Sequence, residues 1–285
     1  MNFSARASQL AGWMTEVRRD LHRHPELSFR EERTGAKIAT FLDEWGYSVR
    51  RVGGTGVRGV LDGVPGSPTV AIRADIDALP VQENTGLDFA STSPGLMHAC
   101  GHDIHTACAL GAARMLAEAR RDGTVPGGVV MLFQPAEEIN RGAEAILRDG
   151  ALSDPTVGMI FGLHNHPAYP AGTIVVKEGP LMAAVDTLKI RILGVGSHGA
   201  IPHRSADPVV AAASVVMNLQ TIVSRNVDPQ DAAVISFGTV HGGAANNVIP
   251  EDVEMTGTVR SFRPEVRNAL HERIRRVAES VASGL

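Results

Sequence analysis

Residues 127–138, GGVVMLFQPAEE, join an unbroken apolar run to a proline and two adjacent glutamates. Apolar residues without polar alternation are typical of a strand buried on both faces, as in a sheet covered by helices on both sides. A second such run, TVAIRAD at 69–75, precedes it, and an alanine-rich helical pattern at 103–121 lies between the two. Helices between near-continuous apolar strands predict a layered α/β domain with a mostly parallel sheet.

The rest of the first 180 residues continues this alternation. We expect helices at 6–22, 31–46 and 142–150, and strands at 47–52, 56–61, 157–163 and 172–179.

The pattern changes near residue 182. We expect strands at 185–196, 232–242 and 252–262, and helices at 207–225 and 264–283. A split βαβ unit with this order would close with one more strand, so the second domain is predicted to be one strand short. The predicted domains are therefore 1–181 and 182–285.

Composition excludes several classes of protein. The 285 residues are 44% apolar, and the 27 basic and 31 acidic residues are interspersed, with no basic stripe for a nucleic acid. No apolar run reaches the ~18 residues of a membrane span, and the N-terminus lacks the apolar core of a signal peptide. We expect a cytoplasmic protein with no nucleic-acid or membrane partner.

Two cysteines are a poor basis for a disulfide framework, and Cys108 is interpreted as a small core residue.

Four polar clusters follow predicted strands or begin the next helix. They are RADIDALP at 73–80, HACGHDIH at 98–105, QPAEE at 134–138 and GLHNHP at 162–167. Ligands of open α/β sheets bind at the carboxyl ends of the strands, so these clusters can converge in one crevice. Their combined Cys, His and Glu donors indicate a metal site. Taken singly, a loop histidine is most often a surface or hydrogen-bonding residue, which is our interpretation of His22, His24, His241 and His271.

Cys100 and His102 flank Gly101 at the start of a predicted helix. The helix dipole there favours a thiolate, and the glycine lets both side chains face one point. Thiolate, imidazole and carboxylate donors suit zinc, manganese or cobalt.

Glu137 and Glu138 cannot both point to the same ion from an extended chain. One can bind metal while the other holds the attacking water, as a hydrolase requires. Asp75 and Asp77 are expected to orient the histidines, and Asp103 to support the ligands or the helix start.

The letters GVGSHG at 194–199 fit a dinucleotide-binding fingerprint and are the only sign of a nucleotide-binding module. Pro202 follows, so no helix is expected where a pyrophosphate would bind, and we discount this motif.

Ordered motifs over nearly the whole chain resemble one family of metallo-amidohydrolases, which includes hippurate hydrolase, N-acyl-amino-acid amidohydrolases and auxin-conjugate hydrolases. The motifs are RRDLHRHPELSF, RADIDALP, MHACGHDIHTA, FQPAEE, GLHNHP, GSHGAIPH, DPVVAA and NNVIP followed by GTVR. The resemblance implies a zinc-exopeptidase-like three-layer catalytic domain interrupted by an α+β, ferredoxin-like lid domain that also forms a homodimer.

The resemblance also implies a site for two divalent ions, Zn²⁺ or Mn²⁺ and in some cases Co²⁺. The positions that match metal ligands are Cys100, His102, Glu138 and His164, with Cys100 shared between the ions. Glu137 matches the general base. In the lid, His198 matches a histidine that stabilises the oxyanion in the partner subunit's site, and Asn247 and Arg260 match residues that hold the substrate.

The implied reaction is hydrolysis of N-acyl or N-aroyl amino acids to a carboxylate and a free amino acid.

Two departures from the family pattern stand out. Asp75 replaces a ligand histidine of related aminoacylases and carboxypeptidases, so it is not expected to bind metal. Family members also continue past the lid to a further histidine ligand, so we expect one under-coordinated metal position and an uncovered sheet edge. The alternative function is a truncated, catalytically impaired chain that only binds metal and dimerises.

Overall fold

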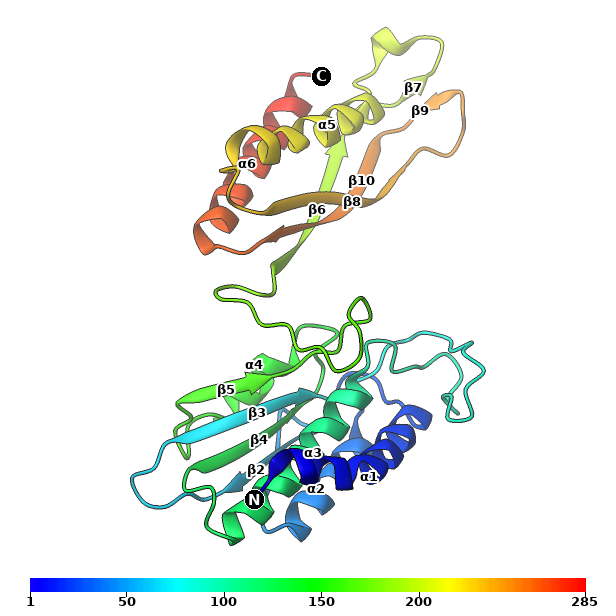
Figure 1. Ribbon diagram of the computed structural model, residues 1–285. Coiled ribbons are helices and arrows are strands. Elements are labelled where there is room, and N and C mark those ends of the chain that lie inside the picture. The colour runs from blue at the N-terminus through cyan, green and yellow to red at the C-terminus, as the bar shows by residue number, and fades with distance from the viewer. The chain divides into compact units, whose positions relative to one another are not determined.

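The computed structural model describes residues 1–285, which form two compact units, Met1–Ala171 and Gly172–Leu285 (Figure 1). The division lies earlier in the chain than the predicted boundary between residues 181 and 182. The strand predicted at 172–179 does not form, and residues 173–177 adopt no regular secondary structure. Its apolar side chains have no partner strand, and Ile174 and Val176 are exposed. That strand prediction is wrong, since apolar β-branched residues form a strand only where a ladder partner exists.

The first unit contains a five-stranded sheet of order β1-β2-β4-β3-β5. Its strands are β1 (Ser48–Val52), β2 (Gly56–Leu61), β3 (Thr69–Asp75), β4 (Gly128–Gln134) and β5 (Met159–Gly162). β3 pairs in parallel with β4 and β5, whereas β2 pairs antiparallel with β1 and β4. The sheet is therefore mixed rather than mostly parallel. The short connection between β1 and β2 permits only a hairpin, which fixes the antiparallel direction.

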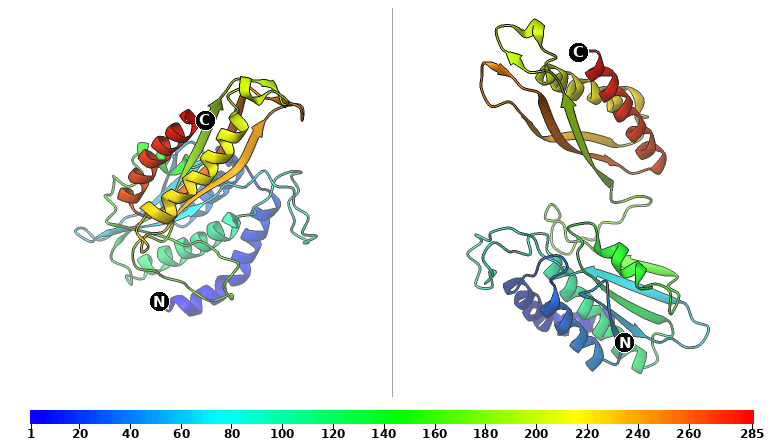
Figure 2. Two further views of the ribbon diagram at one scale, coloured as in Figure 1. Left: turned by 90° about the horizontal axis from the view of Figure 1, so that it is seen from above. Right: turned by 180° about the vertical axis from the view of Figure 1, so that it is seen from behind.

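Helices cover both faces of this sheet and give three layers (Figures 1 and 2). The helices α1 (Phe3–Arg23), α2 (Glu32–Glu44) and α3 (His102–Arg121) share one face, and α4 (Gly142–Arg148) packs on the other.

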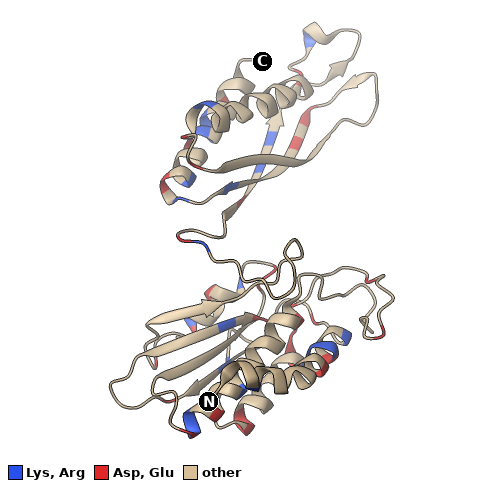
Figure 3. Cartoon of the chain, viewed as in Figure 1, with Lys and Arg blue, Asp and Glu red and all other residues tan.

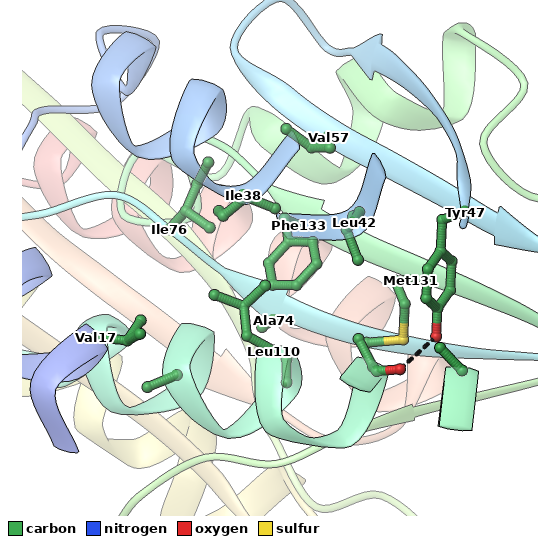
Figure 4. Packing of buried hydrophobic residues seen from close by; sticks show 14 of the residues in the cluster. Val17, Ile38, Leu42, Tyr47, Val57, Ala74, Ile76, Leu110, Met131 and Phe133 are labelled. Carbon is green, nitrogen blue, oxygen red and sulfur yellow. Dashed lines mark hydrogen bonds between the residues drawn. The ribbon is translucent and has the colours of Figure 1, made fainter. Parts of the chain in front are cut away.

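β4 supplies side chains to both faces of the sheet, as its apolar sequence predicts. Met131 and Phe133 pack with Leu110 on the side of α1–α3 (Figure 4), and Val130 and Leu132 pack on the side of α4.

The parallel strands bring the predicted polar clusters to one edge. Asp75 at the end of β3 lies opposite Gln134 at the end of β4. β5 is the edge strand beside β3, and its residues Met159, Ile160 and Phe161 are all exposed.

The second unit is an α+β arrangement. Its main elements are β6 (Ala184–Leu193), α5 (Pro208–Asn226), β8 (Ala233–Gly242), β10 (Asp252–Ser261) and α6 (Pro264–Ser283). The antiparallel sheet has the order β6-β10-β8, and a smaller sheet pairs β7 (Ser197–His198) with β9 (Val248–Ile249). The Asp207 side chain accepts the N–H groups of Val209 and Val210 and so caps α5, as the sequence predicts. Buried residues of α5, α6 and the sheet form a separate core that includes Leu219, Met255 and Leu270.

Charged residues of both signs are interspersed in both units (Figure 3). No helix combines the length and apolar character that crossing a membrane requires.

Candidate metal centre

Gly101 shapes the start of α3, where two predicted ligands lie. Its φ of 83° is in the left-handed region, and a Cβ there would approach the Asn165 side chain to 2.6 Å. Glycine is therefore required both for backbone conformation and for close packing. Directly after it, His102 begins the helix with no solvent exposure.

His102 presents one free nitrogen to a group of carboxylates. Its Nδ1 lies 2.9 Å from the carbonyl oxygen and 3.2 Å from Oδ1 of Asp77, so the ring donates its proton there. The buried Nε2 has no hydrogen-bond partner and lies 3.7 Å from Oε1 of Glu138, which is also buried and unpartnered. A buried nitrogen and a buried carboxylate oxygen that face each other without hydrogen-bond partners fit a bound cation, and the Asp77 contact is typical of a metal-ligating histidine.

Cys100 and His164 extend this group. Cys100 Sγ lies 3.5 Å from Nε2 of His164, and the His164 ring donates from Nδ1 to the Asn165 carbonyl at 2.6 Å. With its Nδ1 proton donated in this way, the neutral His164 ring directs its Nε2 lone pair toward the Cys100 sulfur. Ligand atoms of Cys100, His102 and His164 lie within 4.8 Å of one another, as do those of His102, Glu137 and Glu138. The four residues that match metal ligands are thus brought together around His102.

Both adjacent glutamates face His102, because they lie in a turn and not in an extended strand. Oε2 of Glu137 is 3.9 Å from His102 Nε2, and Asn140 donates its N–H to the Glu137 carbonyl oxygen. The side chain of Glu137 is 39% exposed, against 18% for Glu138. Glu138 is therefore placed as the inner group and Glu137 as the one accessible to solvent.

Asp75, His102 and His105 form a third group of potential donors. However, His105 uses both ring nitrogens: Nδ1 donates to Asp75 Oδ1 at 2.6 Å, and Nε2 accepts the Asn165 N–H at 2.9 Å. Arg73 also pairs with Asp75 at 2.7 Å. Asp75 and His105 are therefore better suited to hold the loop that carries His164 than to bind an ion. The spacing of His105 three residues after His102, on one helix face, is the sequence signal for this role.

Asp103 has contacts directed away from the centre. It accepts from Nε of Arg18 at 2.6 Å and pairs with Nδ1 of His22 at 2.8 Å. His22 in turn lies 3.3 Å from Glu83. Asp103 thus attaches the first turn of α3 to α1 and has no hydrogen bond to a candidate ligand, so its contacts agree with the expected role at the helix start and not with support of the ligands. Cys108 is exposed, so its interpretation as a core residue is wrong.

The carboxylates around the centre favour the protonated forms of Cys100 and His102. Burial, and next the negative charge of Glu138, raise the pKa of Cys100 to about 12. Burial lowers the pKa of His102, but the Asp77 hydrogen bond and the nearby carboxylates outweigh it and raise that pKa overall. The expectation that the helix dipole favours a thiolate is wrong, because Cys100 precedes the N-cap Gly101 and faces carboxylates.

These pKa directions predict that metal affinity rises with pH. Between pH 6 and 8 Cys100 is a thiol in the free protein, so binding as a thiolate must release its proton, and the affinity constant should rise by at least about tenfold per pH unit. Calorimetric titration with Zn²⁺ in buffers of different ionisation enthalpy measures the released protons. Cys100→Ser should release about one proton fewer; equal proton release in both proteins would exclude a thiolate ligand.

The remaining predicted residues lie in the second unit. His198 on β7 is exposed and is adjacent to Asn247 through the hydrogen bond from Gly199 N to Asn247 O, 2.8 Å long. Arg260 has an exposed side chain on β10. The GVGSHG stretch leads into a short 3₁₀ turn, Pro202–Arg204, and not into an α-helix, so it lacks the helix of a dinucleotide site.

The chain is similar to several known proteins. Over 273 residues the chain is 50% identical to N-acetylcysteine deacetylase of Bacillus subtilis, with 95% of this chain and 71% of the relative covered. It is 43% identical to N-acyl-L-amino acid amidohydrolase of Geobacillus stearothermophilus, with 93% and 71% covered. A crystal structure from Bacillus subtilis, described as a dinuclear metal binding peptidase from the M20 family, matches with a TM-score of 0.81 and 45% identity, covering 99% of this chain and 71% of that one. The family model for peptidase family M20/M25/M40 matches residues 71–285. The chain belongs to this peptidase family.

Proposed function

We propose that this protein is a metal-dependent amidohydrolase that cleaves N-acyl or N-aroyl amino acids to a carboxylate and a free amino acid. The observation that carries the proposal is the pair of unpartnered buried atoms, His102 Nε2 and Glu138 Oε1, with the exposed carboxylate of Glu137 beside them. The names of the relatives, two of which act on N-acyl amino acids, support the substrate class.

Two divalent ions are proposed, held by Cys100, His102, Glu138 and His164. Such ions would polarise the amide carbonyl and lower the pKa of the attacking water. The related dinuclear metal binding peptidase supports the number of ions, and the sulfur, nitrogen and oxygen donors support Zn²⁺, Mn²⁺ or Co²⁺ as candidates.

Glu137 is proposed as the general base. Its carboxylate is partly exposed and accepts no hydrogen bond from the protein, so it is free to take a proton from water and pass it to the leaving amine. Glu138 differs in that its backbone N–H is held by Oδ2 of Asp77 at 3.0 Å, which fixes the residue next to His102.

The first unit is proposed as the catalytic domain and the second as a lid that forms a homodimer. His198 accepts the Ala200 N–H at Nδ1, so the neutral ring carries its proton on Nε2, where it can donate to an oxyanion in the partner subunit's site. Asn247 and Arg260 are proposed to hold the carbonyl and the carboxylate of the substrate, the arginine by bidentate pairing.

The test is release of free amino acid from N-acetyl and N-benzoyl amino acids by the protein loaded with Zn²⁺, Mn²⁺ or Co²⁺. We expect N-acyl amino acids to be cleaved at least about tenfold faster than matched N-acyl amines without a carboxylate, because Arg260 would lose its partner. Metal binding without release of any amine would reject the proposal and favour the alternative of a chain that only binds metal and dimerises.

A further inference from the structure

Glu31 is a buried carboxylate outside the candidate metal centre. The residue has no solvent exposure and forms no ion pair. Its Oε2 accepts the Thr55 hydroxyl, and its Oε1 accepts the backbone N–H of Ala136 at 2.8 Å, across 105 residues of sequence. Burying a carboxylate without a cation is costly and raises the pKa of Glu31, and the hydrogen bonds from Thr55, from Ala136 and from the backbone of Glu31 and Phe29 offset part of this cost.

Ala136, the residue that Glu31 holds, has an unusual conformation. Its φ of 49° lies in the left-handed region, which costs a residue with a side chain about 1 kcal/mol or more. It directly precedes Glu137 and Glu138 and separates them from strand β4. The change of direction at Ala136 therefore starts the turn in which both glutamates face His102.

Close packing and hydrogen bonds fix this turn from several directions. A Cβ at Gly142 would lie 1.5 Å from the Pro135 carbonyl oxygen, and one at Gly56 would lie 2.6 Å from Cδ of Pro135. Asp77 holds the N–H of Glu138. The glycines thus constrain Pro135 and Asp77 constrains Glu138, while Glu31 holds the strained residue between them.

We propose that Glu31 is a positioning residue for the paired glutamates. By accepting the Ala136 N–H, it keeps that residue left-handed, so that Glu138 and Glu137 reach the metal centre. The proposal rests on the proposed function only for the roles of these two glutamates.

The experiment compares Co²⁺ affinity of the full chain with that of Glu31→Met and Glu31→Gln, followed by the visible absorption of bound Co²⁺. Methionine has a similar length but no strong acceptor for the Ala136 N–H, so we expect the affinity to fall by about tenfold or more. The glutamine amide oxygen can still accept this N–H, and its NH₂ can donate to Thr55, so Glu31→Gln should stay within about threefold of wild type. The absorption spectrum should change only in Glu31→Met.

Tyr47→Phe is the matched control. It removes one buried hydrogen bond of the Tyr47 hydroxyl (Figure 4), which donates to the Ala113 carbonyl within the same unit and contacts no residue of the turn. We expect its Co²⁺ affinity to match wild type. A Glu31→Met protein that binds Co²⁺ as tightly as wild type would overturn the proposal, and so would a Glu31→Gln protein as weak as Glu31→Met.

If circular dichroism shows that Glu31→Met does not fold, Thr55→Val tests the positioning role of Glu31 instead. Loss of the Thr55 hydroxyl frees one carboxylate oxygen of Glu31, so Co²⁺ affinity should fall by more than the about threefold allowed for Glu31→Gln, and an affinity within that range would contradict the role of Glu31. Absence of hydrolysis by wild type would reject the proposed function alone, because Co²⁺ affinity is measured without turnover.

Discussion

Replacing Glu137 with glutamine is expected to lower the rate of N-acyl amino acid hydrolysis by about 10³-fold while the protein keeps its metal ions. The amide has nearly the shape of the carboxylate but cannot accept a proton from water at neutral pH, and general-base catalysis contributes about 10²–10⁴-fold. Metal content should not change, because Glu137 is the more exposed of the two glutamates and the four proposed ligands remain.

The measurement is kcat with a cleaved N-acyl amino acid, together with elemental analysis of the bound metal. Glu144→Gln is a suitable control, since Glu144 on α4 is exposed and pairs only with Arg148. Its kcat should equal that of wild type. If Glu137→Gln kept more than a tenth of wild-type kcat, the assignment of the general base would be wrong.

Replacing His102 with alanine should have the largest effect on metal binding, by about 10³-fold or more. His102 belongs to all three groups of potential donors and is fully buried, so no neighbouring side chain or solvent can take its place. Loss of its ring also removes the donor to Asp77 Oδ1 and the positive partner of several carboxylates. Negative charges would then repel one another without an ion to bridge them.

Competition with a chromophoric chelator measures this loss for Zn²⁺ or Co²⁺. His24→Ala is the control. His24 lies at the C-terminal end of α1, and its side chain pairs with Asp20 of the same helix. The two histidine variants should differ in metal affinity but not in their far-UV circular dichroism. Equal affinity of His102→Ala and His24→Ala would exclude a metal centre at His102.

The fold was predictable where burial dictates the residue pattern. We find β3, β4 and α3 as expected. The apolar strands β3 and β4 supply side chains to the cores on both faces of the sheet, and the apolar face of the alanine-rich α3 packs against one of these cores. The direction of pairing was not predictable in the same way, since it depends on connections such as the hairpin between β1 and β2. The apolar residues 172–179 were misleading for a related reason, as a strand requires a partner as well as a suitable composition.

The candidate site was predictable as a set of donors but not as an arrangement. The motifs pointed to Cys100, His102, Glu138 and His164, whose donor atoms the structure brings together around His102. The protonation of Cys100 was misjudged, because it depends on carboxylates from other segments. The contact of Glu31 with Ala136 joins residues far apart in the sequence and carries no local signal.

Metal dependence of hydrolysis tests the central claim most directly. The protein is stripped with a chelator, dialysed, and assayed for free amine from an N-acyl amino acid before and after Zn²⁺, Mn²⁺ or Co²⁺ is restored. We predict negligible release by the stripped protein and recovery with about two ions bound per chain. Equal rates before and after reloading, or no release with both ions bound, would contradict a metal-dependent amidohydrolase.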